Sequence, residues 1–148
     1  MGKILQIACC LVVFSAFIAC DKDEVDNKIP YVRVDFRFYP YTTDSELASY
    51  GGIKMFSRQG YNGNGVFVCQ FSMTDEPLFM AFDATCPLEQ DTGFKTAVRI
   101  DEGSVLKLKC PKCGTVFDLK NEGRGGGTRL TRYGIRPLGY KIYYQVYS

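Results

Sequence analysis

The sequence predicts an all-β protein, and three observations carry this prediction. Apolar and polar residues alternate between residues 32 and 39, which is the period of a half-buried strand. The chain holds 15 glycines and 10 tyrosines but no tryptophan, a composition typical of strands joined by tight turns. Asn62-Gly63 is a dipeptide that strongly favours a β-hairpin turn, and no long stretch shows the helical period.

Several segments have the apolar patterning or the aromatic and β-branched content of strands. They are residues 32–39, 53–56, 66–71, 78–82, 94–100, 105–109, 117–119, 135–138 and 140–147. Residues 59–65 supply a hairpin turn after the second segment, and Asp44 is expected to cap one helical turn over residues 45–48. We interpret the glycine-rich stretch 123–127 as a loose connecting loop.

Composition limits the number of domains and the classes of partner. A chain of 148 residues that is 46% hydrophobic is ordinary material for one globular domain. The net charge is only +2 and no basic run contains interleaved aromatic residues, so we expect no nucleic-acid partner. The chain has no histidine, and no nucleophile–base pair stands out. We therefore assign no catalytic residues and expect no enzymatic activity of its own.

Residues 1–19 have the features of a signal peptide. Lys3 precedes an apolar stretch that is too short for a stop-transfer helix. The stretch ends in Phe17-Ile18-Ala19-Cys20, which resembles the lipobox of bacterial lipoproteins. That resemblance implies cleavage before Cys20 and acylation of Cys20, which would anchor the protein to a membrane. The alternatives are an ordinary secretory signal and a short membrane helix.

Residues 20–28 are polar and rich in carboxylates, so we expect a flexible tether between the lipid anchor and the domain. Within it, Lys22-Asp23-Glu24 resembles a surface-export signal of outer-membrane lipoproteins. The alternative is that these charges only keep the linker solvated. We expect an extracytoplasmic protein anchored to a bacterial membrane, the outer membrane, and exposed at the cell surface if the export signal is real.

Four cysteines remain once the signal peptide and the lipidated residue are set aside: Cys69, Cys86, Cys110 and Cys113. Because thiols oxidise readily outside the cytoplasm, an even number makes a disulfide an alternative to metal binding. Cys69 shares one face of its predicted strand with Phe67 and Phe71. We therefore favour a buried, hydrophobic role for Cys69 over a role as ligand or disulfide partner.

Two cysteine-bearing loops follow one another in the second half of the chain. Cys110-Pro111-Lys112-Cys113 is a tight turn that aims two sulfur atoms at one point, the geometry of a metal-ligating knuckle. Thr85-Cys86-Pro87-Leu88-Glu89 forms the other loop. With Gly114-Thr115-Val116-Phe117-Asp118 and Arg136-Pro137-Leu138 after them, these loops resemble those of Rieske iron–sulfur domains over residues 66–147.

The resemblance implies a fold and a site. The fold is a two-sheet antiparallel sandwich with a small metal-loop subdomain, and the whole β domain covers residues 29–148. Both histidine ligands of the family are absent: Cys86 and Cys110 stand at the cysteine positions, and Leu88 and Cys113 at the histidine positions. Leu88 cannot bind a metal, whereas Cys113 can do so as a thiolate. A fourth ligand would come from one of three sources: Glu89, Cys69 or water.

Three states of these cysteines remain open at this point. In the first, no metal is bound and Cys86 can form a disulfide with Cys110 or Cys113. In the second, the three thiols bind zinc or iron, and in the third they hold a [2Fe–2S] cluster. We expect a ferredoxin-type protein that transfers electrons to a redox partner, or a descendant of one, with Lys109 and Lys112 near the exposed edge of the site. The alternative is a non-redox surface-binding or structural module in which a disulfide or zinc replaces the cluster.

Overall fold

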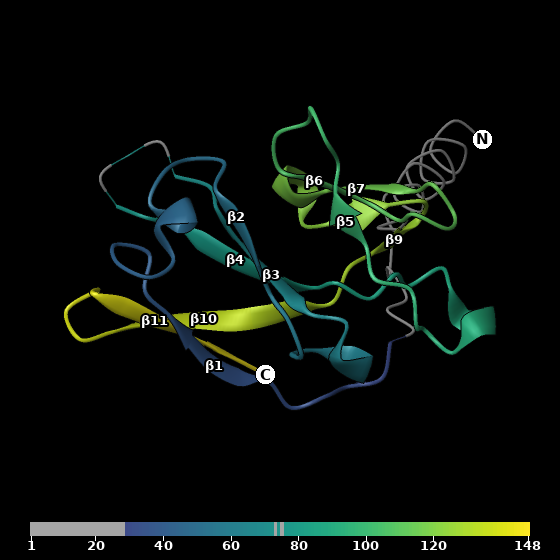
Figure 1. The fold of residues 1–148 in the computed structure, drawn as a ribbon, viewed down its shortest axis with the longest axis horizontal. Coiled ribbons are helices and arrows are strands. Elements are labelled where there is room, and N and C mark those ends of the chain that lie inside the picture. The colour runs from purple at the N-terminus through teal and green to yellow at the C-terminus, as the bar shows by residue number, and fades with distance from the viewer. Residues whose placement is uncertain (1–28, 73, 75) are drawn as a thin grey trace, which may run out of the picture.

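The computed structural model describes residues 29–72, 74 and 76–148 (Figure 1). Within these residues all strand pairings are antiparallel, and the strands form two sheets. The predicted all-β class and its two antiparallel sheets are therefore confirmed. The predicted signal peptide (1–19), the lipidation site Cys20 and the tether (20–28) lie outside the described residues. In the described part of the chain, no helix has the length and apolar character needed to cross a membrane.

The larger sheet has the strand order β1-β11-β10-β4-β3-β2. Its strands are β1 (Asp35–Phe38), β2 (Ile53–Phe56), β3 (Val66–Gln70), β4 (Phe79–Asp83), β10 (Arg132–Leu138) and β11 (Tyr143–Tyr147). β10 changes partner along its length, because its first two residues pair with β4 and the rest pair with β11. The sheet curls so far that its two edge strands meet: the ring centroids of Phe36 on β1 and Phe56 on β2 are 4.7 Å apart.

The curled sheet encloses an apolar centre, which we call the inner core. It consists of Val34, Phe38, Leu47, Val66, Val68, Phe79, Ala81, Tyr133, Tyr144 and Val146. The 3₁₀ turn η2 (Ser45–Leu47) places Leu47 in this core. Three aromatic rings from three strands contact one another: the rings of Phe38 and Tyr144 are stacked, and the ring of Phe79 meets both of them edge-on. Each fully buried side chain of this size contributes about 1.5–3 kcal/mol to folding.

The smaller sheet has the order β5-β6-β7-β8-β9. Its strands are β5 (Arg99–Ile100), β6 (Lys107–Lys109), β7 (Val116–Asp118), β8 (Arg124–Gly125) and β9 (Thr128–Arg129). The small sheet lies beside one end of the large sheet (Figure 1), and the two share a second apolar centre, the inter-sheet core. This core consists of Phe67, Cys69, Phe82, Ala84, Cys86, Val98, Leu106, Leu108, Cys110, Phe117, Leu119 and Leu130.

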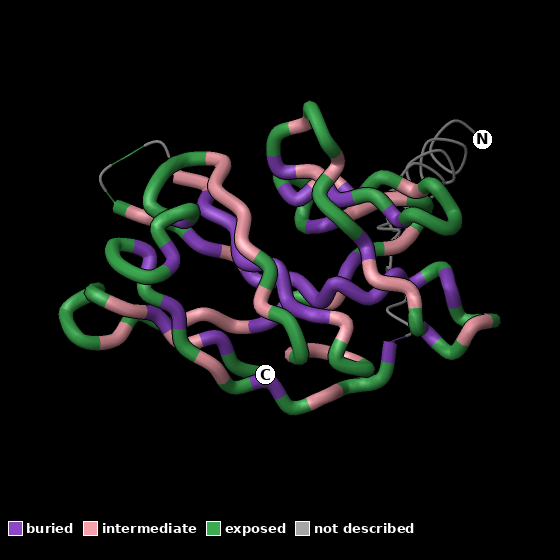
Figure 2. Tube along the Cα trace, in the orientation of Figure 1, coloured by how far each residue is buried: buried purple, intermediate pink, exposed green. Residues whose placement is uncertain are grey.

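β3 is buried along its whole length because it separates the two cores (Figure 2). Val66 and Val68 point into the inner core, and Phe67 and Cys69 into the inter-sheet core. Cys69 is therefore buried in an apolar row, as its strand pattern predicts. The turn before β3 contains η3 (Tyr61–Gly63) and closes the predicted β2–β3 hairpin.

Several predicted strands are shorter than expected. The segment 94–100 contributes only β5, because Phe94 has a φ of +56° and continues the turn after η4 (Gln90–Thr92). The segment 105–109 becomes a strand only at Lys107, because Leu106 has a φ of +57°. Positive φ breaks the extended backbone and is rare outside glycine, so sequence patterning gives no warning of these ends.

Two local predictions need correction. Residues 123–127 are not a loose loop: β8 and β9 pair here as a tight hairpin that follows η5 (Leu119–Asn121). Glycine is needed at Gly125 because a Cβ there would lie 2.2 Å from the carbonyl oxygen of Val116. The turn η2 exists, but the Asp44 side chain does not cap it. Its Oδ2 instead accepts the backbone N–H of Tyr39 at 2.6 Å, which closes the turn after β1.

Candidate metal centre

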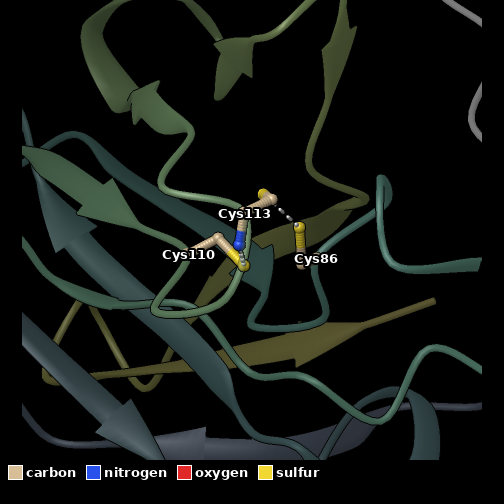
Figure 3. A group of neighbouring side chains, drawn as sticks. All are labelled: Cys86, Cys110 and Cys113. Carbon is tan, nitrogen blue, oxygen red and sulfur yellow. Dashed lines mark hydrogen bonds between the residues drawn. The ribbon is translucent and has the colours of Figure 1, made fainter. Parts of the chain in front are cut away.

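Three cysteines from two separate loops meet at the edge of the inter-sheet core. Cys86 follows β4, whereas Cys110 and Cys113 lie in the turn between β6 and β7 (Figure 3). Their Sγ atoms all lie within 4.8 Å of one another, and those of Cys86 and Cys113 are 3.8 Å apart. Cys86 and Cys110 are buried and Cys113 is exposed, so the group reaches the surface on one side. All three are free thiols, as is Cys69.

Backbone hydrogen bonds close the turn that carries Cys110 and Cys113. The N–H of Cys110 donates to the carbonyl oxygen of Thr115 at 2.9 Å, and the N–H of Gly114 donates to that of Cys110 at 3.0 Å. Gly114 has a φ of +74°, a conformation that glycine adopts without steric cost. The sequence Cys-Pro-Lys-Cys-Gly therefore specifies a compact turn that holds its two sulfur atoms close together.

The loop that carries Cys86 is held by the buried carboxylate of Asp83, which sequence analysis did not single out. Asp83 Oδ2 accepts the backbone N–H of Tyr61 at 2.7 Å and the hydroxyl of Tyr133 at 2.6 Å, and Oδ1 accepts the N–H of Thr85 at 2.8 Å. These bonds join β4, β10 and the β2–β3 turn directly beside Cys86. The only sequence signal was a lone carboxylate at the end of an apolar strand.

Hydrogen bonds from nearby backbone groups reach each of the three sulfur atoms. The N–H of Cys113 donates to Cys110 Sγ at 3.5 Å (Figure 3). The backbone of Leu88 hydrogen-bonds to Cys86, and the backbone of Thr115 hydrogen-bonds to Cys113. The Thr115 hydroxyl oxygen is also 3.3 Å from Cys113 Sγ. Such bonds favour the thiolate over the thiol, and comparable bonds orient the ligands of metal sites.

The surroundings act differently on the two thiols that face each other. Burial raises the pKa of Cys86 well above its ordinary value, and the neighbouring Cys110 adds to this rise. Burial also disfavours the thiolate of Cys113, but hydrogen bonds with Thr115, and then with Cys110 and Cys86, together outweigh it and lower the pKa of Cys113. Cys113 is therefore the more readily ionised of the two, and a bound cation would deprotonate both.

The donor set fits a single tetrahedral ion that prefers sulfur. Zinc bound to thiolates at about 2.3 Å places neighbouring sulfur atoms about 3.8 Å apart. Cys86 and Cys113 already have this separation, 3.8 Å, and Cys110 lies within 4.8 Å of both. A small movement of the Cys110 side chain would therefore give three corners of a tetrahedron.

The other predicted site residues surround this group without joining it. Glu89 is buried, and its Oε2 pairs with Lys112 Nζ at 2.6 Å. Leu88 is 42% exposed and packs on the β8–β9 turn, since its Cδ1 lies 2.8 Å from where a Cβ on Gly126 would be. Cys69 lies within the inter-sheet core, with its thiol donating to a backbone carbonyl of β4 at 3.5 Å. A role for Glu89 or Cys69 as fourth ligand requires movement.

Fold and site together define an all-β protein of two antiparallel sheets with a three-cysteine group able to hold a metal. Comparison with known proteins adds no relative to this description. No protein-family model matches the sequence, and no curated protein matches it significantly. The resemblance to Rieske domains therefore stays a prediction that rests on the order and spacing of the motifs.

Proposed function

We propose that this chain is a lipid-anchored descendant of Rieske electron-transfer domains that binds one metal ion through Cys86, Cys110 and Cys113. One observation carries the proposal: thiols from two loops far apart in the sequence converge within 4.8 Å, with a backbone hydrogen bond to each sulfur. Apolar packing alone does not require three thiols to meet, whereas a metal ion does.

The separation of the sulfur atoms favours one ion over a two-iron cluster. In a Rieske arrangement Cys86 and Cys113 would belong to different irons, and ligands of different irons lie further apart than ligands of one ion. Here the Sγ atoms of Cys86 and Cys113 are only 3.8 Å apart, which is the edge length of a single tetrahedron of thiolates around zinc. Iron in this position would exchange one electron with a redox partner, and zinc would hold the two loops together. Water on the exposed side is the simplest fourth ligand.

A second candidate is a non-redox module in which a disulfide replaces the metal. The contact between Cys86 Sγ and Cys113 Sγ favours this reading, because a modest rotation of either side chain would bring the sulfur atoms to bonding distance. The apolar packing of Leu88 at a lost histidine position agrees with it. Such a bridge would close a loop of about two dozen residues and stabilise the fold by roughly 3 kcal/mol.

Metal and thiol analysis of the full chain, purified without oxygen, separates these functions. We expect one equivalent of iron or zinc per chain, with no labile sulfide, and loss of the metal in Cys86→Ser, Cys110→Ser and Cys113→Ser. Cys69→Ser is the matched control, because Cys69 lies outside the sulfur group and should leave the metal content unchanged. Metal-free protein with two titratable thiols among the four described cysteines would support the disulfide form. Two irons with two sulfides would support a cluster.

The double variant Leu88→His/Cys113→His tests descent from a Rieske domain. Both substitutions restore the residue type that the family has at these positions. If the loops keep cluster geometry, reconstitution with iron and sulfide should give a reddish protein with an electron-paramagnetic signal. The single variant Leu88→His is the control, since it restores only one histidine. A double variant that folds but takes up no iron would count against the Rieske assignment, and it would not bear on metal binding by the three cysteines of the unaltered chain.

A further inference from the structure

The ion pair of Glu89 with Lys112 joins the two loops that carry the three thiols. Glu89 belongs to the Cys86 loop, residues 85–94, and Lys112 lies inside the Cys-x-x-Cys turn between β6 and β7. Glu89 Oε2 and Lys112 Nζ are 2.6 Å apart. Among the described residues, the only other polar contacts between this loop and this turn are those among the sulfur atoms themselves. The ion pair is therefore the polar contact that can hold the two loops together whatever the state of the thiols.

The two ends of this ion pair lie in different surroundings. The Glu89 side chain is only 7% exposed, whereas that of Lys112 is 51% exposed. A buried carboxylate is costly unless it is paired, so its partner matters far more than the partner of a surface charge does. Within the described part of the chain, Lys112 forms the only ion pair with Glu89. The buried carboxylate therefore fixes where Lys112 lies, and with it the turn that carries the two neighbouring thiols.

The backbone around Glu89 is itself held in place. Its N–H donates to the carbonyl oxygen of Cys86 at 3.3 Å, and its own carbonyl oxygen accepts the N–H groups of Thr92 and Phe94, both at 3.2 Å. Phe94 has a φ of +56°, a conformation that is costly for a non-glycine residue and persists where the surrounding structure fixes it. The side-chain amide of Asn64 donates to the carbonyl oxygen of Phe94 at 2.9 Å and ties this turn to the β2–β3 connection. Glu89 is therefore a fixed point of the fold.

We propose that Glu89 and Lys112 are positioning residues, which hold the thiols of the two loops close enough to bind a metal before the metal arrives. The inference rests on the proposed metal site. The ion pair holds the turn against the Cys86 loop, where the Sγ atoms of Cys86 and Cys113 are 3.8 Å apart. Ligands that are already in place lose less freedom on binding, so the affinity for the metal is higher. Glu89 thus acts through the geometry of the thiols and is not a fourth ligand.

The affinity of the metal-free full chain for Zn²⁺, measured without oxygen against a coloured chelator, tests this role. We expect Lys112→Met to weaken Zn²⁺ binding by about tenfold to a hundredfold, the range typical of variants that lose a contact supporting the ligands of a metal site. Lys112→Arg keeps a cation that can pair with Glu89, so its affinity should stay within about threefold of the unaltered chain. Lys109→Met is the matched control, because Lys109 is exposed beside the same turn and forms no ion pair within the described residues. Equal affinities of Lys112→Met and Lys109→Met would overturn the proposal.

The double variant Glu89→Gln/Lys112→Met separates positioning from direct ligation by Glu89. If the pair acts as one unit, each single variant and the double variant should lose a similar factor in Zn²⁺ affinity, and the visible spectrum of the Co²⁺ form should keep its shape in all three. The double variant leaves no buried charge unpaired, so it also provides the measurement if Lys112→Met does not fold. Tighter Zn²⁺ binding by Lys112→Met, or a Co²⁺ spectrum that changes in Glu89→Gln, would mean that the carboxylate is a ligand and would refute the positioning role.

Cross-linking of Cys86 to Cys113 by dibromobimane gives a readout that needs no metal. In a Cys110→Ser background these are the two thiols left in the group, and peptide mass mapping identifies the link between them. Because the rate depends on how closely the thiols are held, Lys112→Met should slow this link at least about fivefold, and Lys109→Met should leave it unchanged. A chain that binds no Zn²⁺ but cross-links in a Lys112-dependent way would refute the proposed metal function and retain the positioning role. A chain that binds Zn²⁺ but depends on Lys112 in neither assay would refute the positioning role alone.

Discussion

Tyr133→Phe is the sharpest probe of the network that positions the Cys86 loop. The substitution removes only the hydroxyl that donates to Asp83 Oδ2 at 2.6 Å and keeps the buried ring. A hydrogen bond to a charged group contributes about 1.5–3 kcal/mol to stability, so we expect the free energy of unfolding to fall by about 2 kcal/mol. For a domain of about 120 residues this corresponds to a decrease in Tm of about 8 °C.

Urea denaturation and calorimetry of Tyr133→Phe at pH 7 measure this loss. Tyr144→Phe is the matched control, because Tyr144 is also a buried tyrosine but its hydroxyl has no partner. Removing an unpaired hydroxyl should leave stability unchanged or raise it slightly. If both variants lost the same free energy, the cost would come from altered packing, and the bond to Asp83 would not explain how the loop is held.

The pH dependence of the stability of Tyr133→Phe gives a second test of the bond to Asp83. Burial, and then the bond to Asp83, raise the pKa of Tyr133 in the folded protein. The native state therefore keeps this proton while the unfolded chain loses it above about pH 10. The advantage of the unaltered protein over Tyr133→Phe should be complete below pH 10 and shrink as the pH rises further. A stability difference between the two proteins that increased above pH 10 would contradict a raised pKa of Tyr133.

Two further predictions concern buried groups elsewhere in the two cores. Burial raises the pKa of Cys69, so its contribution to stability should be present below about pH 8.5 and fall by about 1.4 kcal/mol per pH unit above it. Under reducing conditions, Cys69→Ala should make the alkaline loss shallower in a urea series from pH 7 to 10. Gly60→Ala should lower the free energy of unfolding by more than about 2 kcal/mol, because Gly60 has a φ of +73° and a Cβ would lie 2.5 Å from Asp83 Oδ2. Gly103→Ala is the control, because Gly103 has a similar φ of +83° but open space around it. This variant should lower the free energy of unfolding by only about 1 kcal/mol.

The parts of the fold that the sequence predicts well are those specified by neighbouring residues. The β2–β3 hairpin follows from two apolar segments and the Asn62-Gly63 turn between them, and the structure confirms it. The strands of the small sheet are harder to predict from the sequence, because Phe94 and Leu106 adopt positive φ only under the constraint of the surrounding fold. The β8–β9 hairpin was missed because Gly125 is required by the close approach of β7, which no local pattern reveals.

The candidate site likewise has one part that the sequence predicts and another part that depends on segments distant in the chain. The convergence of Cys86 with Cys110 and Cys113 was expected from the spacing and order of the two loops, and the structure brings the three sulfur atoms together. The network around Asp83 was not expected, because its donors come from segments distant in sequence. The pairing of Glu89 with Lys112 has the same origin, since each residue alone resembles an ordinary surface charge.

The double-sided burial of β3 has a consequence for how the chain finds its alignment. Val66 and Val68 face one apolar interior and Phe67 and Cys69 face another, so a slip by one residue would exchange the two sets without exposing any of them. Hydrophobic burial therefore cannot select the correct register of β3 against its neighbouring strands. Directional anchors at its ends must do so, and the carboxylate of Asp83, bonded to the turn that leads into β3, is well placed for that task. Anyone grafting new loops onto this scaffold should keep that carboxylate and its donors as one unit.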